Sequence, residues 1–344
     1  MKGQVTTTSR GATIRRRIVS VPALMLGALV LLVTVPIWLP IALVVDLFVA
    51  PRRFPHTRLL AFALLWSWLE SAGLIRATAI WCTGRGRRLD PHYRLQRWWA
   101  RSLVAALRHT CGLTIEVEGV DALTSGPAIA LVRHASLADA LLSAWLFAEQ
   151  ARLQPRYVLK RELLADPCLD VVGNRLPNHF LDRNATDSAP ELAALEHLTR
   201  GLGTGEVAVI FPEGTRASPA KRERALASIA ARDPERSSRL RDLRVLLPPR
   251  PAGSAAMLAG APDVDVVVVW HVGFDGLDTF GGILRRIPLQ GTPARFVVRR
   301  VPRAEVAQGG DFTAWLDATW LALDTEVSAA LAARDGEAVL PPRP

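Results

Sequence analysis

The sequence predicts an α/β domain with a central, mostly buried β-sheet flanked by helices, preceded by an N-terminal membrane-associated helical region. From about Thr114 onward, short apolar runs alternate with helical stretches. Before that point the chain is apolar, basic and rich in tryptophan. The length of 344 residues suffices for one large domain and an accessory segment. We therefore expect one α/β domain over residues 113–338 and a disordered tail at 339–344.

The predicted strands are short apolar runs separated by helical patterns, an alternation typical of an α/β domain with a buried sheet. The strand-like runs are Thr114–Val120, Ala128–Val132, Arg156–Leu159, His179–Asp182, Val207–Phe211, Val264–Val272 and Arg295–Val301. The helical patterns are Leu137–Ala151, Pro190–Leu202, Pro219–Ala231 and Phe312–Ala333. No internal repeat interrupts this order.

Residues 1–17 form a basic N-terminal segment, and residues 18–112 form the expected membrane-associated region. Ile18–Val45 contains no charge and exceeds the roughly 20 residues that a helix needs to cross a bilayer. Pro36 and Pro40 interrupt it. Three interpretations stay open. A hairpin explains the arginines on both flanks, and a single tilted span explains one flank. A signal peptide conflicts with the length of the apolar core.

A second apolar stretch, Leu59–Trp81, contains Glu70 and Arg76, and this favours an interfacial amphipathic helix over a span. A further helical stretch around Leu95–His109 leads into the α/β domain.

The charge of +10 is concentrated in the first part of the chain. Residues 1–110 carry 16 Lys and Arg against Asp46, Glu70 and Asp90. Basic residues beside apolar, tryptophan-rich runs fit an anionic membrane surface. Nucleic acid is the competing partner, and we expect none, because the basic residues form no stripe within a known motif. The three cysteines show neither disulfide nor metal-ligand spacing. We expect a location at the cytoplasmic face of the cell membrane.

The stretch LVRHASLADALL places His134 and Asp139 where an apolar run meets a helical one. At a strand-to-helix turn, Asp139 could accept the Nδ1–H of His134 and leave Nε2 free to take a proton. The alternative is a polar strand end with an acidic residue at a helix N-terminus. A second group, FPEGTR at residues 211–216, follows the strand-like run EVAVI, where α/β proteins place ligand sites. Arg216 suits phosphate binding, although a Pro-Gly loop with a surface ion pair is the alternative.

The two motifs, in this order, resemble those of the glycerophospholipid acyltransferase superfamily, in particular the 1-acylglycerol-3-phosphate (lysophosphatidic acid) acyltransferases. The first family motif reads Asn-His-x-Ser-x-x-Asp, so Ser136 and Asp139 match while Arg133 replaces the Asn. VLKRELLADPCLDVVG resembles a second block through Lys160, Glu162, Leu163 and Gly173. NHFLDR resembles a block that ends in an arginine, here Arg183.

The later part of the chain extends this resemblance. The stretch around Lys221 and VLLPPRPAGSAAML at 245–258 are similar to the longer, eukaryote-like branch. VDVVVVWHVGF is similar to the last apolar block but lacks its usual proline pattern. The resemblance covers roughly residues 115–300.

The resemblance implies transfer of an acyl group from acyl-CoA or acyl carrier protein to the hydroxyl of a lysophospholipid. His134 is the expected base and Asp139 its orienting partner. The residues expected to bind the acceptor are Lys160, Arg183, Glu213, Gly214, Thr215 and Arg216. Lys160 also stands out because this chain otherwise uses arginine, with Lys2 and Lys221 as its other lysines; a solvated charge beside Glu162 is the alternative. We interpret His179 as a packed strand residue.

No Ser or Cys sits in a nucleophile-elbow pattern, so direct transfer without an acyl-enzyme is expected. We expect no metal and no cofactor beyond the acyl donor. The expected partners are a membrane lipid and an acyl thioester. Two alternatives remain: another acceptor, such as glycerol 3-phosphate, dihydroxyacetone phosphate or another lysophospholipid, and a catalytically dead membrane lipid-binding protein.

Overall fold

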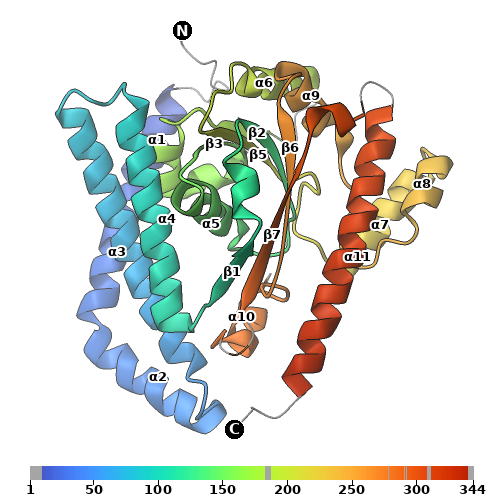
Figure 1. The fold of residues 1–344 in the computed structure, drawn as a ribbon. Coiled ribbons are helices and arrows are strands. Elements are labelled where there is room, and N and C mark those ends of the chain that lie inside the picture. The colour runs from blue at the N-terminus through green and yellow to red at the C-terminus, as the bar shows by residue number, and fades with distance from the viewer. Residues whose placement is uncertain are drawn as a thin grey trace. The chain divides into compact units, whose positions relative to one another are not determined.

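A computed structural model (Figure 1) describes residues 10–182, 187–277, 279–289, 291, 293–307 and 311–339. The chain folds into two compact units. The first comprises Met1–Leu113, Ala140–Ala194 and Thr279–Gln290, and the second Thr114–Asp139, Leu195–Asp278 and Gly291–Pro344. Each unit is therefore assembled from segments that are distant in the sequence. Of the predicted tail at 339–344, all but Val339 lies outside the described residues.

The described part of the second unit contains a five-stranded mixed sheet in the order β1-β7-β6-β2-β5. β2 pairs in parallel with both β5 and β6, β1 pairs in parallel with β7, and β6 pairs antiparallel with β7. The strands are β1 (Ile115–Glu118), β2 (Ala128–Val132), β5 (Glu206–Ile210), β6 (Asp265–Val272) and β7 (Ala294–Val301). Because β5, β2 and β6 run in the same direction, their carboxyl ends meet at one edge of the sheet.

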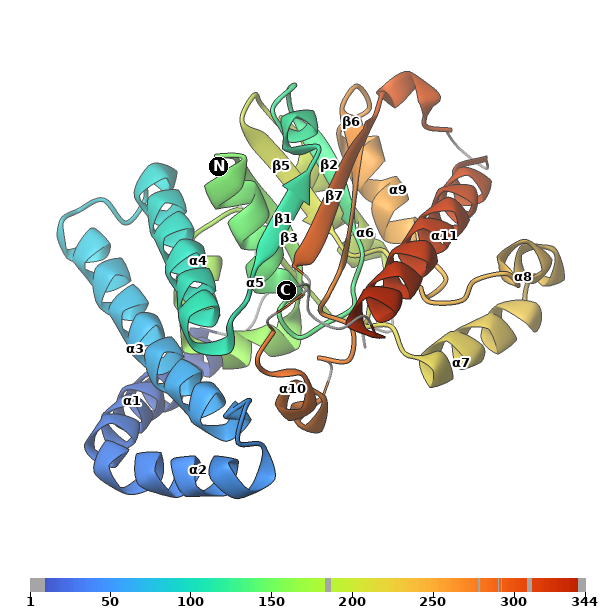
Figure 2. The ribbon, with the colours of Figure 1, turned by 60° about the horizontal axis from the view of Figure 1, so that its bottom comes forward.

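The central strands are apolar because helices shield them from water. Every residue of β2 is buried, as expected of a parallel strand that is covered on both faces. α9 (Pro251–Gly260) packs against β2 and α11 (Phe312–Val339) packs against β6, and the two helices also contact each other (Figure 2). α7 (Pro219–Ala230) packs against α8 (Pro234–Leu240).

The first unit contains four N-terminal helices, a short strand pair and several short helices within its described residues. β3 (Gln154–Lys160) pairs in parallel with β4 (His179–Leu181). The helices are α1 (Arg10–Val33), α2 (Val35–Val49), α3 (Pro55–Cys82), α4 (Leu89–Cys111), α5 (Asp139–Ala144), which continues as a π-helix (Trp145–Gln150), α6 (Ala189–Thr199) and α10 (Phe280–Arg286). α5 begins and α6 ends in segments of the second unit. Further single turns lie at Arg161–Ala165 and Leu169–Gly173 in this unit, and at Val120–Leu123 and Arg303–Glu305 in the second unit.

The predicted fold class is confirmed. Each of the seven predicted strands coincides with an observed strand to within a few residues, and β2 has the predicted bounds. The sequence analysis missed α8, α9 and α10, which have 7, 10 and 7 residues. Helices this short show too little apolar periodicity to be recognised.

The long apolar run divides into two helices, because α1 ends at Val33 and α2 begins at Val35. Pro36 occupies the first turn of α2, where its missing N–H costs no hydrogen bond. Within the described residues, Gly11–Val33 and Pro55–Cys82 are long and apolar enough to cross a membrane. The division lies where a hairpin needs a turn, and the choice between a hairpin and a single span stays a prediction.

The helix α3 buries polar side chains and exposes apolar ones. Ser67, Glu70 and Ser71 are buried, whereas Trp68 and Trp81 are 42% and 66% exposed. An interfacial helix would show the opposite pattern, with its polar face in water. Polar groups that face a helix bundle are typical of a helix surrounded by lipid. Together with α1, α3 suggests membrane association, and whether α3 lies at the interface or spans the membrane stays a prediction.

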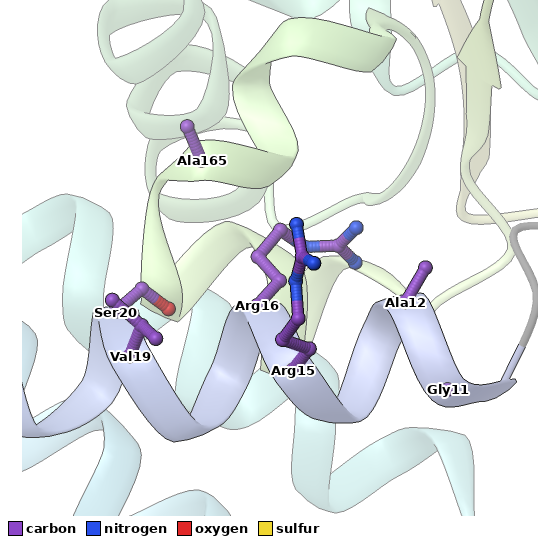
Figure 3. A pocket seen from close by; sticks show the side chains of 7 residues that line it. All are labelled: Gly11, Ala12, Arg15, Arg16, Val19, Ser20 and Ala165. Carbon is purple, nitrogen blue, oxygen red and sulfur yellow. The ribbon is translucent and has the colours of Figure 1, made fainter.

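The basic end of α1 is bonded to the folded part of the first unit. Arg16 and Arg17 both donate to the buried carboxylate of Asp170, at 2.8 and 3.1 Å. Figure 3 shows the side chains of Arg15 and Arg16 extending from α1, where together with Ala165 they line an open pocket. These ion pairs join the N-terminal end of α1 to Asp170, and the signal-peptide interpretation stays an open alternative.

Candidate active site

His134 and Asp139 meet at the carboxyl end of β2. Arg133 still belongs to the sheet ladder, since its N–H donates to Val269 O at 2.9 Å. The chain then turns, and Asp139 is the first residue of α5. The Nδ1 atom of His134 lies 2.8 Å from Oδ2 of Asp139. The two residues are thus paired across a strand-to-helix turn, in the arrangement that the sequence analysis predicted.

The carboxylate of Asp139 collects hydrogen bonds from the turn itself. Its Oδ2 also accepts from the N–H groups of Ala135 and Ser136 at 2.6 and 2.8 Å, and its Oδ1 accepts from the Ser136 hydroxyl. Burial alone would raise the pKa of Asp139, but nearby His271 and the hydrogen bonds from His134 and Ser136 outweigh it and lower the pKa to about 2. Asp139 is therefore ionised at neutral pH and can only accept hydrogen bonds.

The FPEGTR loop follows β5 and holds His134 by its backbone. Glu213 Oε1 accepts the N–H of His134 at 2.8 Å, and the carbonyl of His134 accepts the N–H of Ala217 at 3.0 Å. The ring of Phe211 lies against the imidazole, with 4.9 Å between the ring centroids. Both strand ends therefore fix the position of His134.

Glu213 is fully engaged inside the protein. It is 2% exposed, and its second carboxylate oxygen accepts the N–H of Leu247 at 3.0 Å. Burial raises the pKa of Glu213 to about 7, although the amides of His134 and Leu247 oppose the rise. Glu213 thus joins the His134 turn to the segment before α9, a structural role that the sequence analysis did not predict.

Gly214 needs to be glycine for two reasons. Its φ is +70°, in the left-handed region that other residues avoid. In addition, a Cβ here would lie 3.2 Å from Cδ and Nε of Arg250, which crosses the loop. Thr215 and Arg216 follow, and the Nζ atom of Lys221 donates to Arg216 O at 3.0 Å. The backbone conformation of the loop thus depends on Gly214, and Lys221 of α7 stabilises the end of the loop.

The structure brings six predicted residues into one region of the second unit: His134, Asp139, Glu213, Gly214, Thr215 and Arg216. Lys160 belongs to the first unit, where it is the last residue of β3. Arg183 lies outside the described residues. The roles of Lys160 and Arg183 toward an acceptor therefore stay predictions. His179 is buried, and its Nε2 lies 2.6 Å from Glu191, as suits a packed strand residue.

Sequence analysis missed two residues around Asp139. Arg133, which replaces the Asn of the family motif, is 1% exposed and bonded to Asp275 and to the carbonyl of His271. His271 lies 3.4 Å from Asp139 Oδ1 through its Nε2. A histidine inside the apolar strand Asp265–Val272 was the available signal, but nothing local in the sequence links it to Asp139.

The described residues contain no group of three or more His, Cys, Asp or Glu side chains arranged to hold a metal ion. The arrangement around His134 supports proton transfer. With Nδ1–H donated to an ionised carboxylate, Nε2 of the neutral ring carries the free lone pair. Ser136, whose hydroxyl is buried and donates to Asp139, is occupied as a donor.

One of three comparisons with known proteins covers the residues of this site. The family model described as Acyltransferase matches residues 114–270, which include His134, Asp139 and the FPEGTR loop. Among solved structures, the chain is similar to the 1-acyl-sn-glycerophosphate (LPA) acyltransferase PlsC from Thermotoga maritima, with 17% identity, a TM-score of 0.46, and coverage of 79% of this chain and 98% of that one. The comparison with curated proteins gave no match. The Acyltransferase family model thus matches the part of the chain, residues 114–270, that carries the motifs from which the resemblance was predicted.

Proposed function

We propose that this acyltransferase moves a fatty acyl group from acyl-CoA or acyl carrier protein to the hydroxyl of lysophosphatidic acid, which gives phosphatidic acid. The observation that carries the proposal is the His134–Asp139 pair at 2.8 Å, held in place by the FPEGTR loop. A hydroxyl needs a base to attack a thioester, and this pair is arranged as one.

The reaction follows from the free Nε2 lone pair of His134. Nε2 takes the proton of the acceptor hydroxyl while the hydroxyl oxygen bonds to the thioester carbonyl carbon. Asp139 stabilises the imidazolium that forms. When the tetrahedral intermediate collapses, the carbon–sulfur bond breaks and Nε2 returns its proton to the leaving thiolate. The products are the ester and the free thiol, and His134 is neutral again.

The acceptor is proposed because the FPEGTR loop, which holds the backbone of His134, also carries a cationic side chain, that of Arg216. Lys160 and Arg183 are predicted to bind the same acceptor. A guanidinium suits two-point binding of a phosphate. The membrane-associated first unit supports an acceptor and a product that reside in the bilayer, and we propose the cytoplasmic face as the location.

The test uses full-length protein in liposomes with labelled acyl-CoA and lysophosphatidic acid. Wild type is measured beside His134→Ala and beside His109→Ala, an exposed histidine on α4. We expect labelled phosphatidic acid from wild type and His109→Ala, and a loss of about two to four orders of magnitude in His134→Ala. Folded wild type that transfers label to no lysophosphatidic acid would exclude this acceptor. The same assay with glycerol 3-phosphate, dihydroxyacetone phosphate, other lysophospholipids and acyl carrier protein donors would then distinguish another acceptor from a dead site.

A further inference from the structure

A second imidazole lies beside the carboxylate that orients His134. The Nε2 atom of His271 is 3.4 Å from Oδ1 of Asp139, and both side chains are 1% exposed. Neither ring nitrogen of His271 has a hydrogen-bond partner within the part of the chain that the structure describes. A buried polar group without a conventional partner is uncommon, and one beside a reacting centre is a candidate for a role in it.

The protein holds the His271 ring in place from several sides. Phe274 and Phe296 pack on it, with ring centroids at 5.5 and 5.0 Å. Its backbone carbonyl accepts from Arg133, whose guanidinium also pairs with Asp275. β6 pairs in register with β2 up to Val132, so the backbone of His271 cannot move independently of the His134 turn. The ring therefore has a defined orientation toward Asp139.

The charge state of His271 follows from its surroundings. Burial lowers the pKa of His271, so the ring is neutral at neutral pH. One of its two nitrogens then carries a proton. With the proton on Nδ1, the lone pair of Nε2 would face the Asp139 carboxylate. With the proton on Nε2, an N–H dipole faces it, and this tautomer is favoured.

We propose that His271 is a positioning residue of the acyl-transfer site, whose neutral ring places the dipole of Nε2–H beside Oδ1 of Asp139 and so sets how strongly Asp139 attracts a proton to His134. The inference rests on the proposed role of His134 as the base. The Ser136 hydroxyl donates to Oδ1, and Nε2 of His271 lies 3.4 Å from the same oxygen, so that both polar groups draw negative charge away from Oδ2, which faces His134.

The titratable and charged groups facing this pair are few. Asp139 and His134 come from the turn after β2, Arg133 precedes them, Asp275 follows β6, and Glu213 reaches the turn from the loop after β5. All of them are retained when His271 alone is replaced, so the effect of the ring can be isolated.

The test is the pH profile of kcat/KM for the full-length protein in detergent micelles with the best acceptor of the wild type. His271→Phe removes the donor but keeps a planar ring. In this variant we expect the fall of kcat/KM toward low pH, the acidic limb of the profile, to occur at a pH that is higher by about half a unit to one unit. On this limb kcat/KM would then be about 3- to 10-fold lower than in wild type. His271→Gln, whose Nε2–H can reach the same oxygen, should restore the limb. Phe296→Leu loosens the same packing and should lower Tm without moving the limb.

These outcomes separate positioning from packing. An unmoved limb in His271→Phe, or equal profiles for His271→Phe and His271→Gln, would overturn the proposal and leave His271 a packing residue.

A second measurement needs no substrate. Full-length protein labelled with ¹⁵N-histidine gives imidazole nitrogen shifts, and the His271 signals are those lost in His271→Gln. We expect a neutral ring with its proton on Nε2 that does not titrate between about pH 6 and 8. A proton on Nδ1, or titration in this range, would refute the proposal. This result stands whether or not the wild type acylates lysophosphatidic acid, so failure of the proposed function and failure of this inference are distinguishable.

Discussion

Replacing Glu213 by Gln tests the buried carboxylate that clamps the His134 turn. The side chain is 2% exposed, and burial raises its pKa from 4.5 to about 7. In the unfolded chain the carboxyl loses its proton near pH 4.5, whereas in the folded protein it keeps the proton to about pH 7. Its contribution to stability is therefore fully present below pH 4.5 and is lost as the pH rises to 7.

The size of this effect follows from the two pKa values. A difference between 4.5 and about 7 corresponds to roughly 3 kcal/mol of unfolding free energy. Because Gln does not titrate, the unfolding free energy of Glu213→Gln should not show this decrease between pH 4.5 and 7. Gln also replaces one acceptor oxygen by a donor facing a backbone N–H, which costs about 1–3 kcal/mol at every pH. We therefore expect the variant to be less stable than wild type at pH 4.5 and the gap to shrink or reverse by pH 8.

The assay is denaturant-induced unfolding in detergent micelles at a series of pH values from 4.5 to 8. Glu223→Gln, on the exposed surface of α7, is the matched control and should follow the wild-type curve. A constant gap between wild type and Glu213→Gln across this range would refute the reasoning, because it would mean that Glu213 has the same pKa folded and unfolded.

Three further substitutions test the site. Asp139→Asn offers one acceptor oxygen, whereas both carboxylate oxygens of Asp139 accept hydrogen bonds in the structure. The variant should stay folded and lose about three to four orders of magnitude in kcat. A loss of kcat below tenfold would argue against Asp139 as the partner of the base. Arg216→Ala should raise the KM for the acceptor about 10- to 100-fold and leave kcat unchanged, as measured by steady-state kinetics with varied acceptor concentration. An equal fall in kcat and kcat/KM would mean that Arg216 stabilises the transition state. Arg133→Met leaves Asp275 without its ion-pair partner and should lower the unfolding free energy by about 2–4 kcal/mol. The double variant Arg133→Met with Asp275→Asn should recover part of that loss. If the losses of the two single variants simply added in the double variant, the pair would not interact.

The strands and the pairing of His134 with Asp139 were predictable from the sequence alone. Buried strands such as Ala128–Val132 are apolar runs bounded by polar residues, so local composition is enough to place them. His134 and Asp139 lie five positions apart in the chain, and a single strand-to-helix turn brings them together. The Acyltransferase family was recognisable because its motifs are short and local.

Only the tertiary structure decided what surrounds this pair. Glu213 and His271 reach the His134 turn from other parts of the chain, because β5 and β6 flank β2 and end at the same edge of the sheet. Leu247, from the segment before α9, holds Glu213 in turn. Strand order is a property of the whole sheet, and no residue near Ala128–Val132 encodes it. Arg133 illustrates the same point: the sequence shows that it replaces an Asn, but its burial against Asp275 depends on where β6 lies. The grouping of Ala140–Ala194 with the N-terminal helices likewise depends on contacts between distant segments.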